Sequence, residues 1–213
     1  VSFDQAQRKA LLRCAGFDWS RISPAVFGAL FQSVMDQEKR RHLGAHYTSE
    51  KNILKLIKPL FLDELWKEFK TQRSKAQLVQ FQNKLADLKF LDPACGCGNF
   101  LVIAYRELRL LELEIVRKLW GNVQGAQTLD ISWQSKVDVD QMYGIELEEF
   151  PARIAEVALW LMDHQMNMKL SEELGQYFVR LPLKKSAKIV NGNALTIGWE
   201  TVVAKEKLNY ILG

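Results

Sequence analysis

Apolar positions recur with a helical spacing through most of the first 88 residues of the chain. Within residues 24–41 they return every three or four positions and form one stripe along a predicted helix. The same spacing predicts a helix that starts after Thr48 or Ser49 and that Pro59 should kink or interrupt. The N-terminal region is therefore predicted to be helical, with helices over residues 4–14, over residues 24–41 and in the segment after residues 48–49. Residues 74–87 are polar and amphipathic, which predicts a surface helix or a partly ordered crossing.

After residue 88 the pattern changes to short apolar runs that alternate with long apolar helices. Strands are predicted over residues 89–92, 142–146, 187–191 and 208–212, and helices from about Asn99 to Trp120 and from Pro151 to about Met168. Residues 121–139 look like a loop or an insertion. The order strand, helix, strand, helix, strand is typical of a parallel, doubly wound α/β sheet.

The first predicted strand ends at Asp92 and leads into a turn that carries Gly96 and Gly98. A helix follows at once, so the turn places backbone N–H groups at a helix N-terminus, where a ligand can bind. The two glycines allow a positive φ or a close approach of the main chain to that ligand. A tight strand-to-helix turn without a ligand is the alternative interpretation.

Two details argue against a nicotinamide or flavin cofactor at this turn. Leu101 occupies the position of the third glycine of the dinucleotide fingerprint. The carboxylate of Asp92 would repel a pyrophosphate, whereas it would attract a ligand that carries an ammonium group.

Polar residues also follow the next two predicted strands. The carboxylate of Glu146 can accept both hydroxyls of a ribose. An amide side chain of the segment 191–195, Asn-Gly-Asn-Ala-Leu, can read the edge of an adenine ring. A solvated strand end and an Asn-Gly turn are the respective alternatives. Three strand ends that present polar groups to one crevice favour a joint site for a nucleoside-bearing ligand.

Composition and charge restrict the class of protein. No apolar run reaches the roughly 18 residues that span a bilayer, and Cys14, Cys95 and Cys97 form neither a disulfide framework nor a zinc spacing. A cytoplasmic protein without a membrane or metal partner is expected. Residues 1–88 hold 15 lysines and arginines against 9 acidic residues, and residues 89–213 hold 14 against 16. This asymmetry fits a polyanionic partner, and solvated helix faces fit it as well.

The segment 92–100, Asp-Pro-Ala-Cys-Gly-Cys-Gly-Asn-Phe, resembles the AdoMet-binding motif I of adenine-specific DNA methyltransferases. Residues 44–49 resemble their motif X, residues 144–147 motif II and residues 192–195 motif III. The likeness is closest to the large restriction-modification enzymes that combine a methylase with other activities in one polypeptide. Asn193 stands where the family usually has Asp, and Ser49 stands where it usually has Pro.

This resemblance implies a truncated, Rossmann-like AdoMet-dependent methyltransferase sheet over residues 46–213, preceded by a helical segment over residues 1–45. It implies that Asp92 holds the ammonium group of S-adenosyl-L-methionine, that Glu146 binds its ribose and that Leu147 packs on its adenine. The full set of residues implied to bind the cofactor is Tyr47, Thr48, Asp92, Ala94, Cys95, Gly96, Gly98, Phe100, Glu146, Leu147, Asn193, Ala194 and Leu195. Helix core is an equally good interpretation of Phe100.

The family's catalytic motif, Asn-Pro-Pro followed by Tyr or Phe, occurs nowhere in the sequence. In the family it follows the fourth strand and holds a flipped adenine. We therefore expect no catalytic residue in these 213 residues, and an inactive chain that belongs to a longer enzyme. That enzyme would methylate the adenine amino group of double-stranded DNA in a restriction-modification or phage-defence system. Methylation of a protein or RNA amine, and a non-catalytic cofactor-binding scaffold, remain the alternatives.

Overall fold

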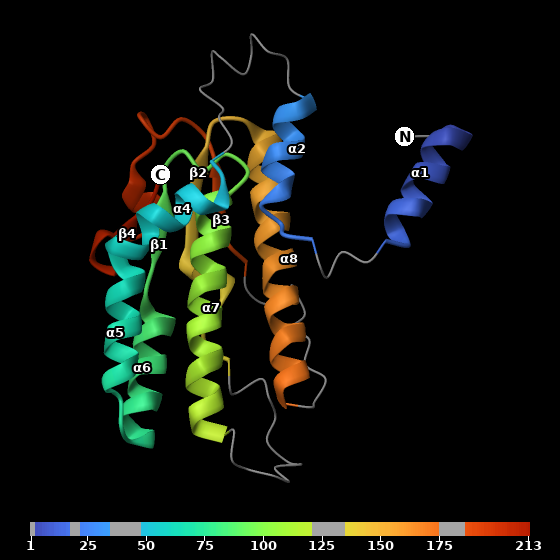
Figure 1. Cartoon of the computed structure of the whole chain (residues 1–213). Coiled ribbons are helices and arrows are strands. Elements are labelled where there is room, and N and C mark those ends of the chain that lie inside the picture. Colours follow the sequence, from blue (N-terminus) through green and yellow to red (C-terminus); the bar gives the residue numbers. More distant parts are fainter. Residues whose placement is uncertain (1–2, 18–21, 35–47, 121–134, 175–185) are drawn as a thin grey trace.

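The computed structural model of the chain describes residues 3–17, 22–34, 48–120, 135–174 and 186–213 (Figure 1). Its centre is one four-stranded parallel sheet in the order β3-β2-β1-β4. The strands are β1 (Phe90–Asp92), β2 (Met142–Glu146), β3 (Lys188–Asn191) and β4 (Tyr210–Ile211). The predicted parallel α/β sheet is confirmed, and the described α-helices that pack on the sheet lie on one of its faces.

The register of the strands brings their carboxyl ends to one edge of the sheet. Asp92 of β1 pairs with Gly144 of β2, and Glu146 at the end of β2 pairs with Asn191 at the end of β3. The chain runs from β1 to β2 to β3 on one side and then returns to place β4 on the other side of β1. In such sheets a ligand binds outside the carboxyl ends of the strands, near the point where the strand order reverses.

Two long helices, α7 (Asn99–Trp120) and α8 (Glu149–Leu174), lie side by side against the sheet (Figure 1). Helix α7 has the predicted bounds. Helix α8 is longer than predicted at both ends. It begins two residues before Pro151, because a proline in the first turn of a helix loses no intrahelical hydrogen bond.

The remaining helices surround this centre, and most of them agree with the sequence pattern. Helix α4 (Glu50–Ile57) continues past Pro59 through the π-helical turn η2 (Lys58–Leu62) into α5 (Asp63–Thr71), and α6 (Lys75–Asp87) follows. The predicted interruption at Pro59 is thus a π-helical turn rather than a break. This turn places the centroid of the Phe61 ring 5.0 Å from that of the Phe90 ring and 5.1 Å from that of the Tyr210 ring. Phe61 therefore covers β1 and β4.

The N-terminal helices α1 (Gln5–Ala15) and α2 (Val26–Val34) differ in how they meet the rest of the chain. Helix α1 buries no residue, whereas α2 packs on α8 and lies at the start of α7. A Cβ atom at Gly28 would lie 2.6 Å from Asn99 Nδ2, so a larger residue at this position would require the Asn99 side chain to shift. Residues 35–41 of the predicted second helix, and the expected domain boundary at residue 45, lie outside the described residues.

A buried polar network joins α7 to α8. The guanidinium of Arg109, which is 3% exposed, donates to Tyr105 Oη at 2.9 Å, to Asp163 Oδ1 at 2.8 Å and to Asn167 Oδ1 at 2.8 Å. Tyr105 Oη donates in turn to Asp163 Oδ1 at 2.6 Å. Each buried charge has a partner of opposite sign, which offsets the cost of removing it from water.

We expect Arg109→Met to lower the free energy of unfolding by roughly 3–5 kcal/mol, because it leaves the buried Asp163 carboxylate without its cation. Arg153 provides the control, since its side chain is 64% exposed and its ion pairs with Glu149 and Glu156 lie in solvent. Arg153→Met should cost no more than about 1 kcal/mol. Urea unfolding of both variants measures the difference, and equal losses would contradict a structural role for the buried network.

Candidate functional site

The turn after β1 adopts the backbone conformation that its glycines allow. Gly96 has a φ of +55° and Gly98 a φ of +79°, both in the left-handed region. A Cβ atom at Gly98 would lie 2.9 Å from Ala155 Cβ, so the glycine also lets α8 pack against the turn. Asp92 is 1% exposed, and its Oδ1 atom accepts a hydrogen bond of 3.0 Å from the backbone N–H of Ala94.

The carboxylate of Glu146 connects this turn to the one that follows β2. Its Oε2 atom accepts from the Gly96 N–H at 2.8 Å, and its Oε1 atom accepts from the Glu148 N–H at 3.0 Å. A carboxylate has about four acceptor positions, and these two bonds use one on each oxygen. One position on each oxygen therefore remains for a ligand that carries two hydroxyls.

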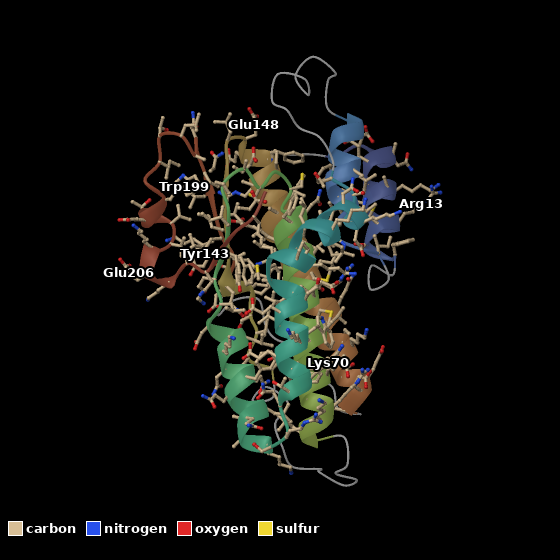
Figure 2. The ribbon with its side chains drawn as sticks, turned by 60° about the vertical axis from the view of Figure 1, so that its left-hand side comes forward. Arg13, Lys70, Tyr143, Glu148, Trp199 and Glu206 are labelled. Carbon is tan, nitrogen blue, oxygen red and sulfur yellow. The ribbon has the colours of Figure 1, made fainter. Side chains whose placement is uncertain are left out.

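The end of β3 is hydrogen-bonded to the end of β2. The Asn191 side-chain NH2 group donates to the carbonyl of Glu146 at 3.0 Å and to that of Leu147 at 2.8 Å, and the Gly192 N–H donates to the Glu146 carbonyl at 2.8 Å. The three strand ends that we expected to converge are thus joined by hydrogen bonds. Figure 2 shows Glu148 and Trp199, which flank these turns, at one end of the molecule and Lys70 at the other.

Asn193 uses its side-chain oxygen within its own turn, where it accepts from the Leu195 N–H at 2.9 Å. The side-chain NH2 group of Asn193 has no hydrogen-bond partner among the described residues. A ligand would therefore meet a donor at this position, together with the second acceptor position of the Oδ1 atom.

The other residues implied by the resemblance are placed as follows. Leu147 and Leu195 expose 55% and 92% of their surface, so both can contact a ligand. Ala194 is half-buried, and its carbonyl accepts from Trp199 Nε1 at 2.8 Å. Phe100 packs against the main hydrophobic core, in line with its interpretation as helix core.

Residues at the motif X position are described only in part. Tyr47 lies outside the described residues, and Thr48 is half-buried just before α4. Glu50, in the first turn of α4, forms an ion pair of 2.8 Å with Arg106 of α7, so this turn lies beside α7.

Two acids, the buried Asp92 and the half-buried Glu146, dominate the electrostatics of the site. Burial raises the pKa of Asp92 to about 7, the Ala94 N–H opposes this shift, and the charge of Glu146 adds to it. Burial and the same acids raise the pKa of the Cys95 thiol, and burial raises that of Cys97 to about 12. Both thiols are therefore protonated near neutral pH and line the turn as small apolar groups. A cationic, hydroxyl-bearing ligand suits such a site better than an anion.

Sequence reasoning included Asn191 in the polar segment after the third strand but did not predict the hydrogen bonds of its side chain. An Asn before a Gly at a strand end is typical of a turn, and only the pairing of β3 with β2 places its side chain on the Glu146 and Leu147 carbonyls. Asn209, which precedes β4, lies at the amino end of β1, where its Oδ1 atom accepts from the Lys89 N–H at 2.8 Å.

Within the described residues, no group of three His, Cys, Asp or Glu side chains is placed to hold a metal ion. Among the helices formed by these residues, none is both long and apolar enough to cross a membrane.

Comparison with known proteins adds sequence and structural relatives. Residues 68–213 match the family described as "MmeI, DNA-methyltransferase domain". The chain is 38% identical over 206 residues to DNA methyltransferase A of Bacillus subtilis (strain 168), an alignment that covers 95% of this chain and 23% of that protein. A solved structure of the type IIL restriction-modification enzyme MmeI in complex with DNA matches with a TM-score of 0.92 and 62% identity, and the match covers 100% of this chain and 28% of that one. The chain therefore spans about a quarter of the length of both relatives.

We expect Asp92→Asn to stabilise the ligand-free chain at pH 8. The raised pKa means that the protonated carboxyl stabilises the fold below about pH 4, and that this stabilisation is lost as the pH rises through 7. The neutral amide keeps the acceptor for the Ala94 N–H and avoids the buried charge. The gain should approach the order of 2–4 kcal/mol at pH 8 and vanish near pH 4.

Urea unfolding across this pH range measures the effect, with the exposed Asp63 of α5 as the control position. Asp63→Asn should show no comparable growth of its effect with pH. A loss of stability at pH 8 in Asp92→Asn would show that the Asp92 charge is favourable in the empty site.

Proposed function

The chain belongs to the MmeI DNA-methyltransferase domain family, and on this premise we propose that it is the cofactor-binding part of an enzyme that methylates the exocyclic amino group of adenine in DNA. A methyltransferase needs a methyl donor, and the proposed donor is S-adenosyl-L-methionine. The observation that carries this proposal is the Glu146 carboxylate, which joins two strand ends and keeps an acceptor position open on each oxygen.

Each part of this donor has a matching group at the site. Asp92 would hold the ammonium group of the methionyl end, beside the backbone of Gly96 and Gly98. Glu146 would accept the two ribose hydroxyls. The exposed side chain of Leu147 would cover one face of the adenine.

Further contacts would come from the remaining residues of the motif match. The NH2 group of Asn193 would donate to an acceptor on the adenine edge, where Ala194 and Leu195 frame the ring. Ala94, Cys95 and Phe100 would line the turn, and Tyr47 and Thr48 would contact the methionyl end.

The donor supplies an electrophilic methyl group on a positively charged sulfur. The negative charges of Asp92 and Glu146 favour a cationic ligand at this edge of the sheet. The chain then acts by binding and orientation, because the Asn-Pro-Pro-aromatic segment that would hold the adenine amino group does not occur in it.

The position of β4 supports the proposal that the Asn-Pro-Pro-aromatic segment of a longer protein would lie close to the methionyl end of the donor. A Cβ atom at Gly213, two residues after β4, would lie 3.5 Å from Asp92 Oδ1. Residues that follow β4 in a longer protein would begin beside this carboxylate. Double-stranded DNA is the proposed substrate, and the DNA complex of the related type IIL enzyme supports it.

We expect the chain to bind S-adenosylhomocysteine, the demethylated form of the donor, and not NAD. Glu146→Ala should weaken this binding at least about tenfold, because each charge-assisted bond to a ribose hydroxyl contributes roughly 1.5–3 kcal/mol. Glu149→Ala is the matched control, since that side chain is 72% exposed. Isothermal titration calorimetry measures the affinities.

Binding of NAD without binding of S-adenosylhomocysteine at millimolar ligand would reject the proposed cofactor. Equal losses in the two glutamate variants would place the ribose elsewhere. Thermal unfolding of each variant shows whether a loss of affinity merely follows a loss of fold.

The 213-residue chain alone is expected to transfer no methyl group, even when it is loaded with S-adenosyl-L-methionine. Transfer requires the adenine amino group in line with the methyl group, and positioning of this kind lowers a barrier by roughly 7–11 kcal/mol. Incorporation of tritiated methyl into DNA tests this, with a no-enzyme control. Incorporation above that control would require a different catalytic site within the chain.

A further inference from the structure

We infer that Asn191 is a positioning residue for the nucleoside half of the proposed cofactor site. This inference rests on the proposed function and assigns a role to a residue that none of the sequence motifs includes. Asn191 ends β3 and pairs in register with Glu146, the last residue of β2.

The Asn191 side chain bridges two successive carbonyls on the neighbouring strand end. Its NH2 group donates to the Glu146 carbonyl at 3.0 Å and to the Leu147 carbonyl at 2.8 Å. These carbonyls lie where the chain leaves the sheet, so the side chain continues the pairing of the two strands by one residue. The position of the Leu147 backbone therefore depends on a side chain from a different strand.

Loss of this bridge should affect the position of Leu147 more than that of Glu146. The Glu146 carboxylate has its own hydrogen bonds to the N–H groups of Gly96 and Glu148. The Leu147 side chain is 55% exposed, so packing against the core does little to hold it. Removal of the Asn191 amide should thus make the position of Leu147, the residue proposed to cover the adenine, less fixed. Glu146, the acid proposed to bind the ribose, keeps its hydrogen bonds to the two backbone N–H groups.

Asn191 is exposed, and a hydrogen bond in contact with water adds little to the stability of the fold. Its loss should therefore appear in ligand binding rather than in unfolding. Asn209 is a matched control, because it is also exposed and also bonds the backbone of a neighbouring strand, through its Oδ1 atom and the Lys89 N–H. That bond lies at the amino end of β1, away from the proposed site.

The experiment compares Asn191→Ala, the isosteric Asn191→Asp and the control Asn209→Ala by calorimetry with two ligands. S-adenosylhomocysteine carries both halves of the cofactor, and 5′-methylthioadenosine carries only the nucleoside half. Both Asn191 variants should bind both ligands roughly tenfold more weakly than the unsubstituted chain, as expected for the loss of one or two hydrogen bonds. Asn209→Ala should bind both as the unsubstituted chain does.

Asp92→Asn provides the converse readout, since Asp92 is assigned to the amino-acid half. It should weaken S-adenosylhomocysteine and leave 5′-methylthioadenosine unchanged.

Unchanged affinities in both Asn191 variants would overturn the inference and leave the proposed function intact. A loss confined to S-adenosylhomocysteine, or an equal loss in Asn209→Ala, would also overturn it, because either result would show that Asn191 does not act on the nucleoside half. Absence of binding by the unsubstituted chain would reject the proposed function and this role of Asn191 together.

Discussion

The bond between the Glu146 carboxylate and the Gly96 N–H fixes the turn after β1 against the end of β2. The pairing of β1 with β2 ends at Asp92, and beyond it the turn also donates from the Cys95 N–H to the Ile145 carbonyl at 3.0 Å. Gly96 can offer its N–H to the carboxylate because its φ is positive, and the second carboxylate oxygen holds the Glu148 N–H. The proposed ribose acceptor is therefore oriented before any ligand binds, which lowers the entropic cost of binding.

This orientation brings two acids close together. Asp92 lies almost fully buried near Glu146, and the pKa of Asp92 rises to about 7 as a result of burial and of that neighbouring charge. The proximity of these two acids thus has an electrostatic cost that a cationic ligand would remove. Sites that favour function over stability in this way are common in enzymes.

Much of the fold could be predicted because its signals are local. The alternation of strands and helices and the two glycines with positive φ follow from residue types close together in the sequence. The roles of Asn191 and Arg109 could not be predicted, because each depends on a partner that only the packed sheet and helices bring near. The early start of α8 before Pro151 was missed because the first turn of a helix tolerates a residue that its interior does not.

The buried pairing of Arg109 with Asp163 has a consequence for recombination among relatives. The two residues lie 54 positions apart, on helices from different halves of the described α/β unit. A chimaera joined between α7 and α8 would take the cation from one parent and the anion from the other. If the second parent lacked a matching acid, the buried guanidinium would keep Glu112 of its own helix at 3.4 Å but would lose the counter-charge that α8 supplies. Viable exchanges between relatives should therefore transfer α7, β2 and α8 as one inherited block.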